Sequence, residues 1–191
     1  MKKILIGTHN KGKFAEIASL VSKKYKKISP ISLKLKSPKE TGKSFVSNSK
    51  LKVKFFSRYV DYPVISDDSG LCIKSLKNIP GIYSARLAKK HGSFFKAMKF
   101  ILKKMKKKKN RKATFVCSLS YKKSGGKIIS VEGKLDGNIS RKIIGKRGFG
   151  YDPIFIPLKE NITLGQMYKS KKVKMDHRFL AFMKLKKKIK I

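Results

Sequence analysis

The sequence predicts a mixed α/β protein, and three observations carry this prediction. Short apolar runs, typical of buried strands, alternate with longer segments in which apolar residues recur at helical spacing. Their order along the chain is strand, helix, strand, helix, two strands, helix, two paired strands and a last helix. The chain has 191 residues, 40% of them hydrophobic, which is enough for a substantial core. We expect one domain over residues 1–191.

The first half of the chain supplies the alternation. Residues 2–8 contain an apolar run that ends at a glycine, which predicts a buried strand. The helix expected at 13–25 has its apolar residues at helical spacing, namely Phe14, Ile17, Leu20 and Val21. Apolar and polar residues alternate over 31–36 as in a half-exposed strand, and a second helix is expected at 44–60. Two short strands, 62–66 and 70–76, are expected on either side of an acid pair.

The second half adds a helix, a strand pair and a terminal helix. Residues 78–86 carry turn chemistry around a Pro-Gly pair. The helix predicted at 93–109 has one apolar stripe, which is typical of core packing: Phe94, Phe95, Met98, Ile101, Leu102 and Met105. A loop with Gly125 and Gly126 joins strands expected at 113–121 and 128–137. A glycine-rich aromatic segment, 145–157, precedes a helix expected at 175–190.

The charge of the chain restricts its partners. It has 50 Lys and Arg but only 10 Asp and Glu, which gives a formal net charge of +40 at pH 7. A DNA-binding protein usually concentrates such charge on one face. Here lysines are spread from Lys2 to Lys190, which favours a solvated lysine surface over a dedicated nucleic-acid site. In either case the positive field attracts polyphosphates.

Cysteine usage and the lack of long apolar runs indicate the compartment. Cys72 and Cys117 form no CxxC pair and no cluster with the histidines, so we expect neither a disulfide framework nor a zinc site. Both are expected to be small buried side chains. The N-terminus lacks the apolar core of a signal peptide, and no apolar run reaches the ~20 residues of a membrane span. The sequence therefore favours a soluble cytoplasmic protein.

The segment from Gly7 to Phe14 follows a strand and opens a helix. Glycines let a backbone approach a phosphate, a helix N-terminus offers free N–H groups, and Lys13 adds a charge. The segment nearly matches the pattern GxxxxGK[ST], but Phe14 replaces the hydroxyl residue that would bind magnesium. A phosphate-binding turn is therefore favoured over a true P-loop, with an ordinary glycine-rich turn as the alternative.

Two adjacent acids, Asp67 and Asp68, stand inside an apolar segment of this lysine-rich chain. Carboxylates at a strand end are apt magnesium ligands, and one can activate a metal-bound water. Successive strand residues face opposite sides, so we expect one acid to act as metal ligand or base and the other to be structural. The alternative is an Asx-turn closed by Ser69 and Gly70.

Two further segments suit a nucleotide base. Glycines flank Phe149 and leave its ring open for stacking, and Asp152 could accept a hydrogen bond from a base N–H. The alternative is an aromatic core corner with Pro153 setting the turn. Lys172 offers a point charge and Arg178 planar paired donors, although His177-Arg178 alone is also typical of a solvated helix start.

Taken in order over nearly the whole chain, six segments resemble the inosine triphosphate pyrophosphatase family, the dITP/XTP diphosphatases. They read THNKGK, ETGKSFVSN, SDDSGL, PGIYSAR, GFGYDPIF and DHR. The resemblance implies two α/β lobes around a long mixed sheet, with the active site in the cleft between them. It also implies a homodimer and Mg²⁺ as cofactor, while the lack of a long apolar run, noted above, predicts no membrane partner. The implied reaction hydrolyses a nucleoside triphosphate to the monophosphate and pyrophosphate, with water attacking the α-phosphate.

The resemblance also implies roles for individual residues. Glu40 and Asp68 match the metal ligands, and Asp68 also matches the proton acceptor. The substrate-binding residues that it implies are Thr8, His9, Asn10, Lys11, Gly12, Lys13, Ser69, Phe149, Gly150, Tyr151, Asp152, Lys172, His177 and Arg178.

This sequence departs from the family pattern at three places. His9 replaces a glycine of the first motif, Ser47 replaces a glutamate, and Asp176 replaces the serine before His177-Arg178. The second change removes an acid that we expect near the metal. The third change is expected to affect which base the site selects. Two other functions stay open on the residues alone: a basic nucleic-acid-binding protein without turnover, and a P-loop phosphotransferase.

Overall fold

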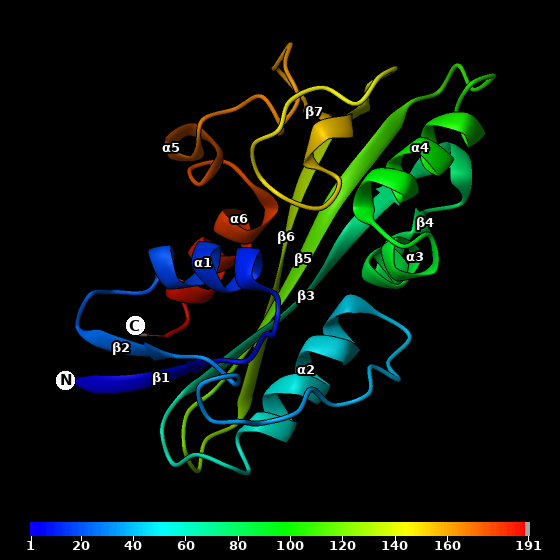
Figure 1. Ribbon diagram of the computed structural model, residues 1–191. Helices are drawn as coiled ribbons and strands as arrows, with labels where there is room; N and C mark the ends of the chain where they lie inside the picture. Colours follow the sequence, from blue (N-terminus) through cyan, green and yellow to red (C-terminus); the bar gives the residue numbers. More distant parts are fainter. Residues whose placement is uncertain (190–191) are drawn as a thin grey trace. The chain divides into compact units, whose positions relative to one another are not determined.

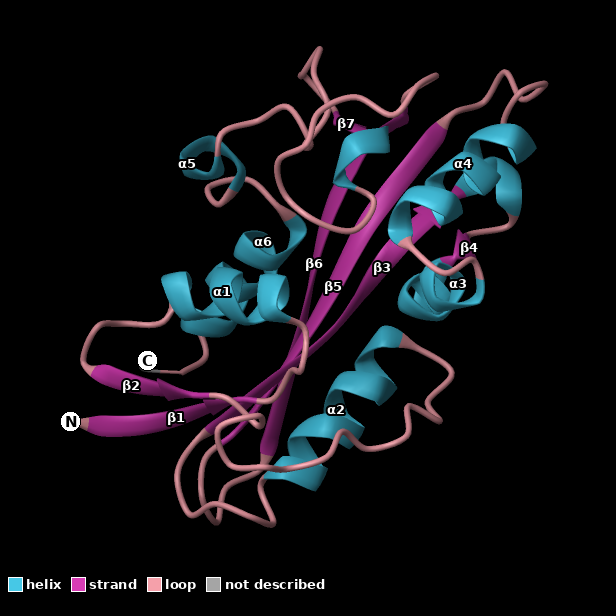
Figure 2. Cartoon of the chain, viewed as in Figure 1, coloured by secondary structure: helices cyan, strands magenta, loops and turns pink. Residues whose placement is uncertain are grey.

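The computed structural model describes residues 1–189, which form a mixed sheet flanked by helices (Figures 1 and 2). The strands are β1 (Lys2–Ile6), β2 (Tyr25–Ile28), β3 (Val64–Ile73), β4 (Ile79–Pro80), β5 (Lys112–Lys122), β6 (Ile128–Ile139) and β7 (Phe155–Pro157). The α-helices are α1 (Lys11–Leu20), α2 (Phe45–Phe56), α3 (Ser84–Lys90), α4 (Phe94–Lys104), α5 (Lys169–Lys172) and α6 (His177–Lys186). Short 3₁₀ turns cover Lys74–Leu76, Gly81–Tyr83 and Asp152–Ile154.

The strand order confirms the mixed α/β class. Within the described residues the seven-stranded sheet runs β2-β1-β3-β5-β6-β7, and β4 pairs with β3 outside this path. Strand β1 pairs in parallel with both β2 and β3. The pairs of β3 with β4 and of β6 with β7 are antiparallel.

The chain divides into two compact units. The first consists of Met1–Asp68, Cys117–Gly133 and the residues from Arg178 to 189, and the second of Ser69–Val116 and Lys134–His177. Strands β3, β5 and β6 each contribute residues to both units. That residues 1–191 form a single domain stays a prediction.

In the first unit, strand β1 is buried on both faces. Ile4 and Ile6 pack in one cluster with residues of α1 and α6, whereas Leu5 packs in another with Val53 and Phe56 of α2. Figure 1 shows α1 and α6 on one side of β1 and α2 on the other. A strand covered on both faces reads as a continuous apolar run, which is why its prediction from sequence was correct.

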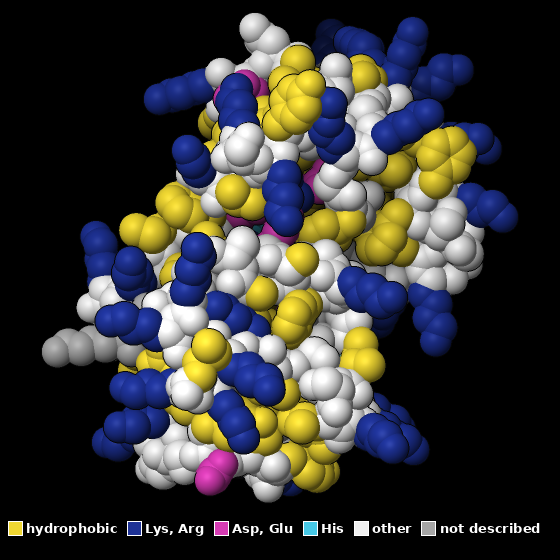
Figure 3. Space-filling model, turned by 60° about the vertical axis from the view of Figure 1, so that its left-hand side comes forward, with side chains coloured by type: hydrophobic (Ala, Val, Ile, Leu, Met, Phe, Trp, Pro, Cys, Tyr) yellow, Lys and Arg dark blue, Asp and Glu magenta, His cyan; other side chains and the backbone are white. Residues whose placement is uncertain are grey.

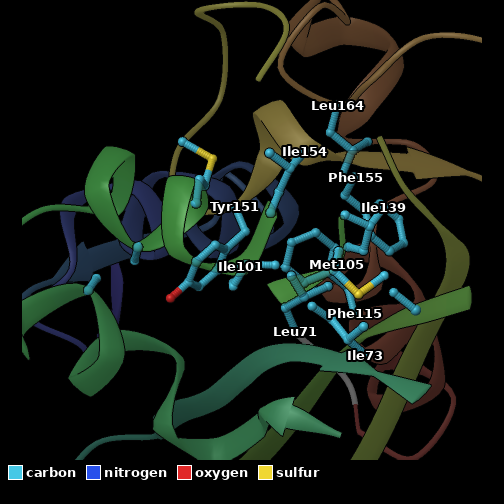
Figure 4. Packing of buried hydrophobic residues seen from close by; sticks show 14 of the residues in the cluster. Leu71, Ile73, Ile101, Met105, Phe115, Ile139, Tyr151, Ile154, Phe155 and Leu164 are labelled. Carbon is cyan, nitrogen blue, oxygen red and sulfur yellow. The ribbon is translucent and has the colours of Figure 1, made fainter. Parts of the chain in front are cut away.

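The core of the second unit gathers around α4 (Figure 4). Met98, Ile101 and Met105 belong to its buried cluster, and Phe94 packs against it, which confirms the predicted stripe. Phe95 is the exception, because 52% of its surface is exposed.

Polar caps set where the helices begin. The side chains of Asn10 and Ser93 accept hydrogen bonds from the backbone N–H groups of Lys13 and Lys96, so α1 starts at the next residue after Asn10 and α4 after Ser93. The last predicted helix is observed as α6, and the part of that prediction at Lys190 lies outside the described residues.

Three sequence predictions were wrong. The strand expected at 31–36 is a turn that starts at Pro30, and β2 lies earlier, where its backbone pairs with β1. The two strands expected around the acid pair are one strand, β3, so the carboxylates stand in the middle of a strand and not at its end. The segment 78–86 contains the start of α3, which its turn-forming residues concealed.

The surface agrees with a solvated lysine coat. On the face that Figure 3 draws, Lys and Arg side chains lie over every part and form no single stripe. Cys117 is buried as expected, while Cys72 is only half-buried. None of the helices between residues 1 and 189 is long and apolar enough to cross a membrane.

We predict that Gly7→Ala destabilises the first unit. A Cβ at this position would lie 2.3 Å from Oγ of Ser66 and 2.6 Å from Cδ2 of Phe56. Overpacking of this kind costs about 1–3 kcal/mol. Urea unfolding should show that loss. Gly126→Ala is the matched control, because its Cβ would have no neighbour closer than 3.4 Å. Equal stability of the two variants would contradict the prediction.

Candidate active site

The loop between β1 and α1 carries the predicted phosphate-binding turn. Oδ1 of Asn10 accepts a hydrogen bond from the N–H of Lys13 at 3.0 Å, and the N–H of Asn10 donates to Oγ1 of Thr8 at 3.3 Å. Helix α1 begins at Lys11, so Gly12 and Lys13 lie in its first turn. A helix N-terminus presents N–H groups that favour an anion. The local geometry therefore fits a phosphate-binding turn.

His9, predicted as part of the same turn, has its side chain engaged elsewhere. Its Nε2 lies 2.8 Å from the carbonyl oxygen of Leu35, and its ring centroid is 6.2 Å from that of Phe56. In this arrangement the imidazole joins the turn to the loop before α2.

Asp67 is fully buried and is bound by cations from two helices. Its Oδ2 lies 3.2 Å from Nζ of Lys13 in α1 and 3.7 Å from Nε of Arg178 in α6. Arg178 also donates to a carboxylate oxygen of Glu16. Burial alone would raise the pKa of Asp67, but the charges of Lys13, Arg178 and Lys52 outweigh it and hold that pKa well below its usual range.

Asp68 has a different set of partners, which confirms that the two acids are not equivalent. Its Oδ2 accepts a hydrogen bond from Nδ2 of Asn48 at 3.0 Å, and its Oδ1 lies 3.7 Å from Nζ of Lys52. Lys52 in turn donates to Oε1 of Glu40 at 2.7 Å. Burial raises the pKa of Asp68, and the charges of Lys52 and Lys13 offset this only in part. A carboxylate with a raised pKa is better suited to accept a proton near neutral pH.

Lys52 is a site residue that the sequence analysis missed. Its side chain is only 7% exposed and contacts both predicted metal ligands. Burial would lower the pKa of Lys52, but the charges of Asp67, Asp68 and Glu40 outweigh it and raise that pKa. A signal was present, since Lys52 falls at helical spacing on the buried stripe of α2, which consists of Phe45, Asn48, Ser49, Lys52, Val53 and Phe56.

Ser47, which stands where the family has glutamate, lies in the first turn of α2. Ser44 and Ser47 form a reciprocal capping box: the N–H of Ser44 donates to Oγ of Ser47 at 2.9 Å, and the N–H of Ser47 donates to Oγ of Ser44 at 3.1 Å. A glutamate at this position commonly closes such a box, so serine preserves the cap. Asn48, the next residue, connects two parts of the site: its Oδ1 accepts from the N–H of Gly42 at 2.8 Å, while its Nδ2 holds Asp68.

The second unit brings three predicted residues together. Oδ2 of Asp152 accepts hydrogen bonds from Nζ of Lys172 at 2.6 Å and from the N–H of Phe149 at 2.8 Å. The ammonium of Lys172 also lies 4.8 Å from the centre of the Phe149 ring, within reach of a cation–π contact. Gly148 has φ of +76°, and a Cβ there would meet Oδ2 of Asp152 at 2.1 Å, so this turn requires glycine.

Tyr151 belongs to the core, although it was predicted among the base-binding residues. Its ring is 2% exposed and packs edge-on against Phe94 at 5.2 Å. Its hydroxyl donates to the carbonyl oxygen of Ser84 at 2.9 Å, and Figure 4 shows the ring inside the buried cluster. The side chain of Tyr151 is therefore part of the core. Gly150 before it has a positive φ of +68°.

Of the remaining predicted residues, His177 begins α6 and Ser69 lies inside β3. The ring of His177 stacks on Phe115 with centroids 4.8 Å apart and an interplanar angle of 12°. Ser69 follows Asp68 directly in β3. Asp176 is 1% exposed and stands at the position before the first residue of α6. Among residues 1–189, no group of three or more His, Cys, Asp and Glu side chains could hold a metal ion.

Comparison with known proteins gives a consistent match over the full chain. The model of the Ham1 family matches residues 4–188. A dITP/XTP pyrophosphatase of Dictyoglomus thermophilum is 41% identical over 191 aligned residues, which cover 96% of this chain and 92% of that protein. A dITP/XTP pyrophosphatase of Caulobacter vibrioides is 38% identical over 96% of both chains.

Solved structures of Ham1 proteins have the same fold as this chain. The Ham1 protein of Staphylococcus aureus superimposes with a TM-score of 0.87 at 33% identity and covers 97% of both chains. A HAM1 protein from Coxiella burnetii gives the same TM-score of 0.87 at 29% identity over 98% of both chains.

We predict that Asp67→Asn destabilises the protein by about 3–5 kcal/mol, because it leaves the half-buried charge of Lys13 and the buried charge of Arg178 without their shared carboxylate. Denaturant unfolding at pH 7 measures the loss. Asp61→Asn, in the exposed loop before β3, is the control and should leave stability unchanged. A loss no larger than that of the control would show that Asp67 is not the anchor of this network.

Proposed function

Because this chain belongs to the Ham1 family, we propose that it is a nucleoside triphosphate pyrophosphatase acting on deaminated purine nucleotides. The substrates in this proposal are ITP, dITP and XTP, and the products are the monophosphate and pyrophosphate. Its support is that relatives 41% and 38% identical over nearly the whole chain are dITP/XTP pyrophosphatases. A homodimer is part of the proposal, and the mass of the protein in solution tests it.

The observation that carries the reaction type is the surroundings of Asp68. The carboxylate is 4% exposed, its pKa is raised by burial, and Asn48 fixes one of its oxygens. A buried base of this kind can take a proton from a water that attacks phosphorus. The nearby ammonium groups of Lys13 and Lys52 can stabilise the negative charge that develops on phosphate oxygens.

The residues present fit a magnesium ion. One ammonium group, that of Lys52, already lies between carboxylate oxygens of Glu40 and Asp68, so both acids can face one cation. Mg²⁺ is usually held by one or two carboxylates together with substrate phosphates and waters, so the lack of a third acid is no obstacle. Glu40 and Asp68 would hold the ion, which would neutralise phosphate charge and lower the pKa of a bound water.

We propose that the same nucleotide uses two further sets of side chains. The start of α1, with Thr8, Asn10 and Lys13, binds the phosphates through backbone N–H groups and one cation. Phe149 supplies a half-buried ring for the base. The ammonium of Lys172 lies near that ring, and Asp152 fixes the ammonium, so the ring is presented in one orientation.

Base selection follows from hydrogen-bond polarity. Hypoxanthine and xanthine present a keto oxygen and an N–H group where adenine presents an amino group and a bare nitrogen. In the proposal, Arg178 donates to the keto oxygen, and adenine would leave donors facing donors, which a polar site rejects strongly. Arg178 is shared with Glu16 and Asp67, which holds its guanidinium in place before substrate arrives.

We predict that ITP yields IMP and pyrophosphate in equal amounts when Mg²⁺ is present, because the water is expected at the α-phosphate. Chromatography of the nucleotides with a pyrophosphate assay measures both products. Asp68→Asn is the matched control: it removes the base and a metal ligand, so turnover should fall about 10²-fold or more. IDP and orthophosphate as first products would instead favour a phosphotransferase. Salt-dependent duplex binding without turnover would favour the nucleic-acid-binding alternative.

A second prediction concerns Asp176, where the family has serine. An ionised aspartate only accepts hydrogen bonds, so it should repel the 2-keto oxygen of xanthine and tolerate the 2-amino group of guanine. We therefore expect Asp176→Ser to raise kcat/KM for XTP relative to ITP, and to lower that for GTP, by about threefold or more. Unchanged ratios would rule out a role of Asp176 in base selection. Asp61→Ser is the control for lost surface charge.

A further inference from the structure

Lys52 occupies an unusual position for a lysine. It projects from the buried face of α2, and its side chain is 7% exposed. Its Nζ lies 2.7 Å from Oε1 of Glu40 and 3.7 Å from Oδ1 of Asp68. One ammonium group therefore neutralises the two carboxylates that we assign to the cation site.

The carboxylate of Asp68 and the loop that carries Glu40 are held in place independently of this ammonium group. Asn48, one turn earlier in α2, donates from Nδ2 to Oδ2 of Asp68 at 3.0 Å and accepts from the N–H of Gly42 at 2.8 Å. Oδ2 of Asp68 is thus directed at the amide, while Oδ1 is directed at Lys52. Through Gly42, the same amide also fixes the loop that carries Glu40. The acid pair can consequently persist when the ammonium group moves.

We propose that Lys52 is the resident counter-ion of this pair and that a divalent cation binds by exchanging with its ammonium group. The inference rests on the proposed function, because that function supplies the cation site. Oxygen ligands approach Mg²⁺ to about 2.0–2.1 Å, which is closer than they approach the ammonium. The carboxylates must close on the ion, and the ammonium must leave the space between them.

Charge leads to the same conclusion. Without the metal, two carboxylates and one ammonium leave this group of side chains with a single negative charge. A divalent cation beside the unmoved ammonium would place three positive charges within a few ångströms, in a buried place where water and salt screen poorly. Lys52 has a long, flexible side chain, so its ammonium can withdraw while its stem stays packed. The cost of this withdrawal weakens cation binding.

The experiment compares Mn²⁺ binding by calorimetry in three proteins without nucleotide. Lys52→Met keeps an unbranched side chain of similar length but removes the competing charge. We expect it to bind Mn²⁺ about tenfold or more tightly than the wild type. Lys54→Met is the matched control, because it removes the same charge from an exposed position of the same helix, and its affinity should be unchanged. An affinity of Lys52→Met equal to or weaker than that of the wild type overturns the exchange.

A second measurement uses the wild type alone and remains decisive if Lys52→Met does not fold. Reductive methylation read by peptide mass spectrometry reports how accessible each ammonium group is. Mg²⁺ should accelerate methylation of Lys52 by about threefold or more, since the released group is no longer bound by the acids, and should leave Lys54 unaffected. A Lys52 rate that Mg²⁺ does not change contradicts the proposal.

These readouts separate the exchange from the proposed function. If the wild type converts ITP but Lys52→Met binds Mn²⁺ no more tightly than the wild type does, the proposed function holds and the proposed exchange is wrong. If the exchange is observed but the wild type produces no pyrophosphate from ITP, the exchange holds and the proposed function is wrong.

Discussion

Two neighbouring carboxylates inside a strand that is covered on both faces impose the main constraint on this protein. Buried charges are tolerated only with partners of opposite sign, so each face must bring its own cation or donor to β3. Lys13 from α1 and Arg178 from α6 do this for Asp67. Lys52 and Asn48 from α2 do it for Asp68. The placement of three helices in the first unit is thereby tied to two adjacent residues.

The same constraint explains where the few acids of this chain are found. Five of the 10 acidic residues are buried, namely Glu16, Asp67, Asp68, Asp152 and Asp176. Lysine covers the surface, where water solvates it at little cost, while half of the carboxylates are kept in the interior, where buried cations need partners of opposite charge. The high net charge is therefore a property of the surface, and the interior holds carboxylates and cations together.

The secondary structure and surroundings of a residue could be predicted from the sequence where its near neighbours in the chain determine them. The run in β1 and the helical spacing in α4 gave correct elements, and strand alternation correctly predicted that Asp67 and Asp68 have different surroundings. The other predictions failed because they depend on contacts between residues that are far apart in the sequence. The alternation at 31–36 suggested a strand, but β1 pairs with Tyr25–Ile28 instead. Lys52 was overlooked because one lysine among so many carries no signal until its place on the buried stripe of α2 is considered.

The division of the chain has a consequence for synthesis on the ribosome. The first unit is assembled from three separate stretches of sequence, and the last of them begins at Arg178. A nascent chain grows by roughly 5–20 residues per second and folds from its N-terminus as segments emerge. Asp67 must therefore wait until a further 111 residues, 68 to 178, have been translated before Arg178 arrives, with Lys13 as its earlier partner. The ion-pair network of Asp67 can be completed only after this last stretch has been made, so a chain that stops before Arg178 carries the acids without their full set of partners.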